Sequence, residues 1–356
     1  MENLTSDYLN LIKEYIPGEQ PKDKKYVKLN TNENPYPPSD RVLTALAKIN
    51  CSDLRLYPDP DSTRLRDKLA TVYNLKTENV FVGNGSDEVL SYSFLAFFKK
   101  EKPLFWGDVT YSFYSAIADL FQISYREIKS DDEFKFKAEC FTKECGGIII
   151  AHPNAPTGIV TGVEFIEEVL KKNQDKVVLV DEAYVDFGAV SVVPLVKTYK
   201  NLLVIHTFSK SRCFAGIRVG YAFGDEKLIQ ALLKVKNCFN SYPVNTISQE
   251  LCIAALNDQV YYDMINKKII ATRNSISKRI QHLGFKVLDS KANFLFLSSE
   301  KHRAEYLFAK LKERSILVRH FNKKRIENFL RVTIGTENEM DFFVNTLEQL
   351  IKESEI

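Results

Sequence analysis

The sequence predicts an α/β fold: a large domain with a mainly parallel sheet flanked by helices, followed by a smaller α+β domain. From about residue 80, short apolar runs alternate with helical stretches. Continuous apolar runs are typical of strands buried on both faces, as in a parallel sheet covered by helices. After about residue 240 the pattern changes to a long helical stretch and shorter strand candidates, which indicates the second domain.

The apolar runs are the expected strands of the large sheet. They lie at residues 80–82, 104–106, 148–151, 177–180, 202–206 and 219–223. In an open α/β sheet, ligands bind beyond the carboxyl ends of the strands. The residues that follow each run are therefore candidate site positions.

The second domain is expected to begin with a helical stretch over residues 248–283. Strand candidates follow at residues 294–297, 316–318 and 330–334. The spacing of Thr336 and Glu339 matches a capping box and predicts the start of the last helix.

The chain is expected to divide into three parts. Residues 1–40 are rich in proline and lack periodicity, which indicates an arm that lies over another part of the protein. Residues 41–245 should form the large domain and residues 246–356 the small one. The length of 356 residues suits about two domains.

Composition excludes several classes of protein. Apolar residues make up 45% and charged residues 27% of the chain, as in ordinary folded proteins. A net charge of +3 is too small to indicate a nucleic-acid partner. The six cysteines show neither a Cys-x-x-Cys pair nor metal-ligand spacing, so we expect reduced thiols, no metal and a cytoplasmic protein. No signal peptide and no apolar run of about 18 residues is present, so we expect no membrane partner.

The first candidate site is the glycine-containing turn after the run at 80–82. Residues 83–88 read GNGSDE and precede an apolar helical stretch. Glycines allow a tight turn, and free N–H groups at the following helix start can bind an anion such as phosphate. An ordinary turn with a capped helix is the alternative, because the segment is neither a P-loop nor a dinucleotide fingerprint.

Asp181 and Lys210 are the other candidates. A carboxylate at the end of the run at 177–180 needs a cationic partner when buried, although a salt bridge or a helix cap would also satisfy it. A lysine at the rim of a low-dielectric cleft can lose its proton and attack an aldehyde, although most lysines are solvated surface groups. An amine, a carboxylate and an anion pocket with Arg218 beside it together suit pyridoxal phosphate, which has an aldehyde, a basic ring nitrogen and a phosphate.

A set of longer motifs occurs in a fixed order along the chain. They are NTNENPY (30–36), RLYPD (55–59), GNGSDE (83–88), PNAPTG (153–158), DEAYVDF (181–187), FSK (208–210), AGIRVGY (215–221) and LRVTIGT (330–336). With these motifs the sequence resembles the class-II pyridoxal-phosphate-dependent aminotransferases of fold type I, and among them the histidinol-phosphate aminotransferases. The resemblance covers nearly the whole chain.

The resemblance implies a fold-type-I transferase in which residues 1–40 contribute to the small domain and to a dimer interface. The implied catalytic residues are Lys210, which would form an imine with the cofactor and carry a proton, Asp181, which would pair with the ring nitrogen, and Tyr184, which would bond the phenolic oxygen. The implied cofactor-binding residues are Tyr57, Gly85, Ser86, Asp87, Tyr111, Asn154, Asp181, Tyr184, Ser209, Lys210 and Arg218. Tyr57 would reach the cofactor of a neighbouring subunit, which implies a homodimer with shared sites.

The implied reaction is transamination of L-histidinol phosphate with 2-oxoglutarate, giving imidazole-acetol phosphate and glutamate in histidine biosynthesis. The implied substrate residues are Tyr15, Asn34, Arg319 and Arg331. Arg331 would bind a carboxylate and Arg319 a phosphate, although composition alone also allows surface ion pairs for both. Phosphothreonine decarboxylation and aromatic amino-acid transamination remain open on the same scaffold. A ligand-sensing module without catalysis is disfavoured, because no basic helix-turn-helix segment is evident.

The sequence departs from the family pattern at three places, of which one is minor: Val109 stands where the family often has a proline before Thr110. Ala155 stands where the family has an asparagine against the phenolic oxygen, and Asn154 is the candidate substitute. Residues 212–214 read RCF where the family often has small and glycine-rich residues.

The basic residues 323–325 are expected to form a solvated loop, with attraction of a phosphorylated substrate as the second interpretation.

Overall fold

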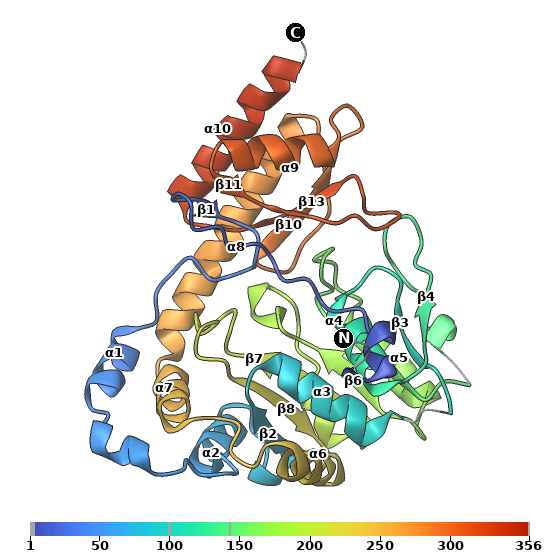
Figure 1. Ribbon diagram of the computed structural model, residues 1–356, viewed down its shortest axis with the longest axis vertical. Helices are drawn as coiled ribbons and strands as arrows, with labels where there is room; N and C mark the ends of the chain where they lie inside the picture. Colours follow the sequence, from blue (N-terminus) through green and yellow to red (C-terminus); the bar gives the residue numbers. More distant parts are fainter. Residues whose placement is uncertain (1–3, 99–100, 142–143, 355–356) are drawn as a thin grey trace.

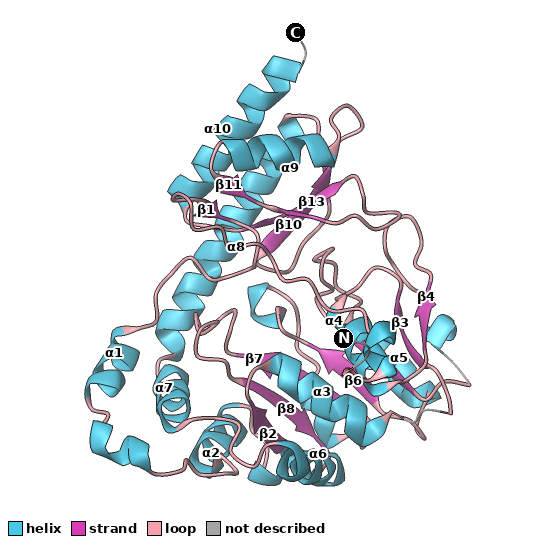
Figure 2. Cartoon of the chain, viewed as in Figure 1, coloured by secondary structure: helices cyan, strands magenta, loops and turns pink. Residues whose placement is uncertain are grey.

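The computed structural model describes residues 4–98, 101–141 and 144–354, which fold around two main sheets (Figures 1 and 2). We call residues 40–256 the large half and residues 286–354 the small half. The long helix α8 (Gln259–His282) runs from one half to the other (Figure 1). Within the described residues, no helix is both long and apolar enough to cross a membrane.

The large half contains a seven-stranded sheet, which confirms the α/β prediction. The strand order is β2-β8-β7-β6-β5-β3-β4. All neighbouring pairs from β7 to β4 are parallel, and β8 is antiparallel to both of its neighbours. The strands are β2 (Val80–Gly83), β3 (Leu104–Gly107), β4 (Tyr125–Ile128), β5 (Gly147–Ala151), β6 (Val178–Asp181), β7 (Leu202–Thr207) and β8 (Gly220–Gly224).

Alternate side chains of these strands fill two hydrophobic cores, one on each face. Val178 and Val180 of β6 pack in the core that contains side chains of α2, α5 and α7, whereas Leu179 packs in the core that contains those of α3, α4 and α6. Because both faces are covered, the strands are largely apolar, with the edge strand β4 as the exception. The helices of this half are α1 (Asp40–Ala47), α2 (Thr63–Val72), α3 (Ser86–Phe97), α4 (Phe113–Phe121), α5 (Val163–Lys172), α6 (Glu226–Phe239) and α7 (Thr246–Leu256).

The small half is an antiparallel sheet packed against helices. Its strand order is β12-β13-β10-β9, and its core includes side chains of α8, α9 and α10. The elements are β9 (Lys286–Val287), β10 (Phe294–Ser298), α9 (Ala304–Glu313), β12 (Arg319–His320), β13 (Phe329–Thr333) and α10 (Glu337–Ser354). The expected capping box is confirmed: the Thr336 N–H donates to the Glu339 carboxylate at 2.7 Å, and the Glu339 N–H donates to the Thr336 hydroxyl at 3.4 Å.

The N-terminal arm is attached to the small half. Its strand β1 (Val27–Lys28) pairs in parallel with β11 (Ile316–Leu317). Before β1, the arm contains one short 3-10 helix, Asp7–Leu11. The segment after β1 passes between the two halves, which brings its residues to the site described below.

Two expectations about secondary structure were wrong. The stretch at 248–283 is divided into α7 and α8, because Asn257 and Asp258, whose side chains compete for backbone hydrogen bonds, separate the two helices. Strand β4 was not expected, because as an edge strand it exposes Tyr125, Arg126 and Glu127 and has no continuous apolar run.

The expected division after residue 245 stays a prediction. Side chains of α7 and of the first turns of α8, such as Leu251, Tyr262 and Ile265, pack in the same core as β6 and β7. The change of core along the chain therefore falls within α8, where Ile269 and Ile276 pack in the core of the small half.

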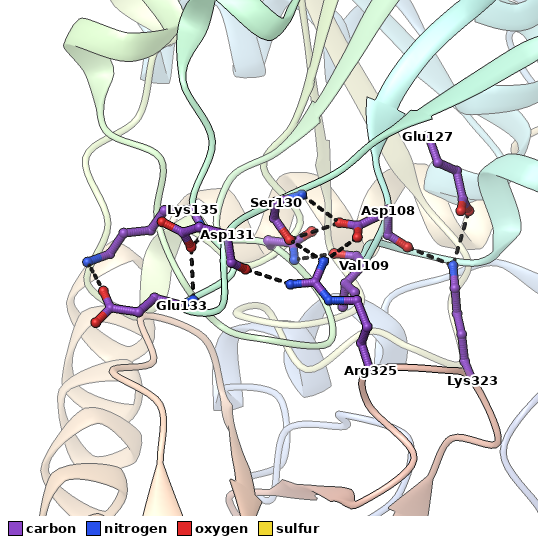
Figure 3. Close-up of polar contacts among 10 residues, drawn as sticks. Asp108, Val109, Glu127, Ser130, Asp131, Glu133, Lys135, Lys323 and Arg325 are labelled. Atoms are coloured by element: carbon purple, nitrogen blue, oxygen red, sulfur yellow. Dashed lines mark hydrogen bonds and ion pairs between the residues drawn. The ribbon is translucent and has the colours of Figure 1, made fainter.

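The expectation of a solvated loop holds for part of residues 323–325: they lie in a loop in which Lys323 and Lys324 are exposed, whereas Arg325 is half-buried. Arg325 forms an ion pair with Asp108 and donates to the backbone oxygen of Asp131 at 2.6 Å (Figure 3). Lys323 pairs with Glu127 at 3.1 Å and donates to the backbone oxygen of Asp108 at 2.7 Å. These residues connect the small half to the loop after β3, because carboxylates there face the basic residues across the interface.

The Arg325→Ala variant should lose more stability than Lys323→Ala. Without Arg325, the Asp108 carboxylate, whose side chain is 15% exposed, keeps no cation, and breaking such a pair costs about 3 kcal/mol. Lys323 and Glu127 are 47% and 39% exposed, so their pair contributes less than about 1 kcal/mol. Urea unfolding of both variants measures the difference, and equal losses would contradict it.

Candidate active site

A cavity of about 290 Å³ lies between the two halves, at the carboxyl edge of the large sheet. Eleven of the predicted site residues line it: Tyr15, Ser86, Asp87, Tyr111, Asp181, Tyr184, Ser209, Lys210, Arg218, Arg319 and Arg331. The arm contributes Thr31, Asn32 and Glu33, which the sequence analysis did not single out. The sheet thus brings together residues that are far apart in the sequence.

Asp181, the last residue of β6, is a buried carboxylate at the floor of this cavity. The Tyr114 hydroxyl donates to its Oδ2 at 2.7 Å, and the Ala183 N–H donates to its Oδ1 at 3.1 Å. Burial raises the pKa of Asp181 despite these hydrogen bonds. Its ionised form would therefore be stabilised by a cationic ligand group in the cavity.

Tyr114 was missed by the sequence analysis. It lies in the first turn of α4, three residues after Tyr111, which precedes the helix. Burial and the neighbouring Asp181 raise the pKa of Tyr114, so the phenol stays protonated and remains a donor. Its proximity to Tyr111 in the sequence was the available signal, but its carboxylate partner belongs to a distant strand.

Lys210 lies three residues beyond the end of β7 and faces the same cavity. Its Nζ donates to the backbone oxygen of Thr31 at 3.4 Å and lies 5.6 Å from the centroid of the Tyr184 ring. The structure gives it no ion pair with a described carboxylate. Its amine is thus placed among weak polar and aromatic contacts, beside Asp181 in the lining.

The start of α3 has the geometry of a candidate anion site. Gly85 precedes the helix with φ of +88°, and Arg218 lies directly beside it: a Cβ added to Gly85 would come within 2.6 Å of the Arg218 Nη2. A Cβ added to Gly220 of β8 would come within 2.3 Å of the Ser86 backbone nitrogen. Glycine at both positions therefore lets the helix N-terminus and a guanidinium approach each other closely, which favours an anion.

Arg218 is held by neighbours that also line the cavity. Its Nη2 pairs with Asp87 at 3.3 Å, and its Nη1 donates to the Ser209 hydroxyl at 3.5 Å. The Tyr111 hydroxyl donates to the other Asp87 oxygen at 3.3 Å. These long contacts leave the guanidinium available to a stronger anionic partner.

Two more arginines reach the cavity from the small half. Arg319 donates to the backbone oxygens of Ile16 and Pro17 at 2.8 and 3.1 Å, and Arg331 donates to that of Asn30 at 3.0 Å. Among the residues that the structure describes, neither arginine forms an ion pair with a carboxylate. The structure therefore does not support the alternative that both arginines belong to surface ion pairs. The buried Nε of Arg331 has no hydrogen-bond partner, and burial lowers the pKa of Arg331.

Tyr15 closes the cavity on the side of the arm. Its ring packs edge-on against Tyr111, with 5.7 Å between the ring centroids. Burial raises the pKa of Tyr15, so its hydroxyl remains a donor. Tyr15, Arg319 and Arg331 therefore form a second region of the cavity that favours anions.

Four predicted site residues do not line the cavity. Gly85 contributes only its backbone, in the turn that precedes α3. The Asn34 side chain donates to the Lys210 backbone oxygen at 3.0 Å. The Asn154 side chain points elsewhere: it donates to the Val109 backbone oxygen at 2.9 Å and accepts from the Thr110 hydroxyl at 2.8 Å. Tyr57 is 82% exposed and stacks on Tyr242.

Comparisons with known proteins identify the class of protein to which this fold and cavity belong. A family model described as aminotransferase class I and II matches residues 24–347, so the chain belongs to this family. It is 48% identical to a histidinol-phosphate aminotransferase of Clostridium botulinum strain Langeland, over 98% of each chain. It is 47% identical to the enzyme of that name from Brachyspira hyodysenteriae, over 99% of this chain and 100% of the relative.

Solved structures show the same fold. The histidinol-phosphate aminotransferase of Clostridium acetobutylicum superposes with a TM-score of 0.84 at 23% identity, over 92% of this chain and 99% of that one. That of Sinorhizobium meliloti, solved with pyridoxal-5'-phosphate, has a TM-score of 0.84 at 22% identity, over 93% and 92%. An L-threonine-O-3-phosphate decarboxylase of Porphyromonas gingivalis reaches 0.80 at 20% identity, over 91% and 99%, so fold alone does not select the reaction.

The Asp181→Asn variant should be more stable than the unchanged chain when no ligand is bound. Because burial raises the pKa of Asp181, folding loses stability as pH rises from the ordinary aspartate value, about 4, through the raised value. Asparagine does not titrate, so the difference in free energy of unfolding between Asp181→Asn and the unchanged chain should grow over that pH range and then stay constant. Unfolding at several pH values measures it, and a difference that shrinks with rising pH would contradict the argument.

Proposed function

We propose that this chain is a pyridoxal-phosphate-dependent transaminase that converts L-histidinol phosphate and 2-oxoglutarate into imidazole-acetol phosphate and glutamate, a step of histidine biosynthesis. The observation that carries the proposal is the meeting of Lys210, Asp181 and the candidate anion site at α3 in one cavity. Full-length relatives at 47–48% identity that are named histidinol-phosphate aminotransferases support it.

The residues present fit the cofactor at three points. Asp181 is a buried carboxylate with a raised pKa, which suits a protonated ring nitrogen. The close approach of Ser86 and Arg218, which a Cβ on Gly85 or Gly220 would block, suits a phosphate. Pyridoxal phosphate, when bound, supplies a ring that withdraws electrons from the substrate α-carbon.

The remaining steps belong to the side chains of this protein. Lys210 would hold the aldehyde carbon and, once displaced by the substrate amine, would carry the proton between the substrate α-carbon and C4′ of the cofactor. Asp181 would keep the ring nitrogen protonated, while the Tyr114 hydroxyl keeps that carboxylate in place. The Tyr111 ring would stack on the ring face, and Tyr184 would donate to the phenolic oxygen. Ser209 and Arg218 would hold the phosphate.

Substrate choice would be made by the arginines of the small half. Arg331 would bind the carboxylate of glutamate, and Arg319, with Tyr15, would bind the phosphate of histidinol phosphate. A planar guanidinium binds both kinds of anion through paired N–H groups, so one site can accept the two substrates in turn. Phosphothreonine decarboxylation and aromatic amino-acid transamination use the same elements and are the alternatives.

We also propose a cytoplasmic homodimer with shared sites. The exposed Tyr57 would reach the phosphate of the neighbouring subunit's cofactor, and residues 1–40 would contribute to the interface. Tyr57 is exposed together with Leu54 and Leu56 of the same segment, and such a group of exposed apolar side chains supports a partner surface there. The separate cores support a large domain and a small domain, expected at residues 41–245 and 246–356.

The substrate test uses the purified holoenzyme. Histidinol phosphate should convert the bound cofactor to its amine form faster than phenylalanine or phosphothreonine, and 2-oxoglutarate should restore it. Release of carbon dioxide from phosphothreonine would instead favour decarboxylation. The Lys210→Ala variant should lose at least about 1000-fold in turnover, because both the covalent attachment and the proton carrier are removed.

The two arginines should differ in the substrate they affect. Arg319→Gln should raise KM for histidinol phosphate by about 10- to 100-fold, as expected for a charged hydrogen bond, with a smaller effect for glutamate. Arg331→Gln should raise KM for both substrates. Steady-state kinetics with each substrate in turn measures this, and equal effects of Arg319→Gln on both would contradict the assignment.

A further inference from the structure

We propose that Asn32 is a positioning residue that makes Tyr184 a hydrogen-bond donor toward the cavity. In doing so it compensates for Ala155, which stands where the family has an asparagine. The inference rests on the proposed function, because the acceptor of the Tyr184 proton would be the phenolic oxygen of the cofactor.

Asn32 is held in place by hydrogen bonds from its backbone to the small half of the protein. It is 1% exposed and has φ of 56°, in the left-handed region that asparagine tolerates. Its backbone oxygen accepts from the Asn293 side chain at 3.0 Å, and its backbone N–H donates to the Thr333 hydroxyl at 2.9 Å. The backbone of Asn32 is therefore fixed against β13 and the residue before β10, and its side chain extends from there toward Tyr184 in the loop after β6.

Thr333 determines which way the Asn32 amide faces. Its hydroxyl already accepts from the Asn32 backbone N–H, and it has a single proton to donate. That proton is directed to the Asn32 Oδ1, 3.0 Å away. The other end of the amide, Nδ2, must then face Tyr184, and it lies 2.9 Å from the Tyr184 hydroxyl.

The hydrogen bond from Asn32 fixes the direction of the Tyr184 proton. Because the amide can only donate at Nδ2, the Tyr184 oxygen accepts there, and its own proton needs another acceptor. Among the described residues, none accepts it at hydrogen-bond distance. Tyr184 lines the cavity, and its ring is packed edge-on against Phe294, with 5.1 Å between centroids. The proton is therefore available to a ligand.

Ala155 makes this donor more important. Its side chain lines the cavity but has no polar atom. Asn154 cannot take its place, because its amide donates to the Val109 backbone oxygen and to the Thr157 hydroxyl, both at 2.9 Å. Neither Ala155 nor Asn154 can therefore donate into the cavity, and Tyr184, oriented by Asn32, would supply the donor there.

Asn32→Asp tests the inference, because it keeps the size and the backbone preference but reverses the hydrogen bond. A carboxylate only accepts, so it would take the Tyr184 proton away from the cavity. In the holoenzyme, the pH at which the absorbance of the bound cofactor changes should rise by about one unit. The deprotonated form of the cofactor should become less stable, because its phenolic oxygen loses the hydrogen bond from Tyr184 and gains a negatively charged neighbour. The dissociation constant for pyridoxal phosphate should rise by about tenfold.

Tyr184→Phe provides the matched background. If Asn32 acts through the Tyr184 hydroxyl, Asn32→Asp should shift the absorbance change much less in Tyr184→Phe than in the unchanged protein. An equal shift in both backgrounds would show a direct effect of charge and would overturn the inference. Thr333→Val, which frees the amide to rotate, serves if Asn32→Asp does not fold, and it should give a smaller upward shift.

The outcomes separate this inference from the proposed function. A wild-type protein that stays colourless with pyridoxal phosphate overturns both. A coloured wild-type protein whose absorbance change is unaltered by Asn32→Asp, or by Thr333→Val where that variant is used, overturns the role of Asn32 alone.

Discussion

The cavity is built around one buried carboxylate, Asp181. Asp181 ends a strand that is covered on both faces, so it is removed from water, and burial raises its pKa. Two donors, the Tyr114 hydroxyl and the Ala183 N–H, hold it without neutralising its charge. A buried, ionised carboxylate lowers the free energy of unfolding unless a cation binds beside it. The protein accepts that cost at the place where the cavity lies, which is typical of a functional site.

The cavity is formed jointly by the two halves and the arm. The large half supplies the amine, the carboxylate and the candidate anion site at α3, and the small half supplies Arg319 and Arg331. The arm crosses between them, and its backbone oxygens accept from both arginines. The spacing between Asp181 and the two arginines therefore depends on how the halves are held together, including by the ion pair of Arg325 with Asp108 (Figure 3).

Sequence reasoning succeeded where a residue's role follows from local pattern. The strands were visible because both faces are buried, and Asp181 and Lys210 were found because they follow strands. It failed where a partner comes from a distant segment. Asn154 was expected to replace the missing asparagine, yet its amide is occupied by Val109 and Thr157.

The sequence by itself determined the α/β class, the family and the residues that suit pyridoxal phosphate, because strand burial and turn chemistry leave regular local patterns. Only the tertiary structure decided which polar atoms meet. The contacts of Tyr114 with Asp181 and of Asn32 with Tyr184 join residues 67 and 152 positions apart. Hydrogen-bond direction depends on distances of about 3 Å in three dimensions, and no spacing along the chain encodes them.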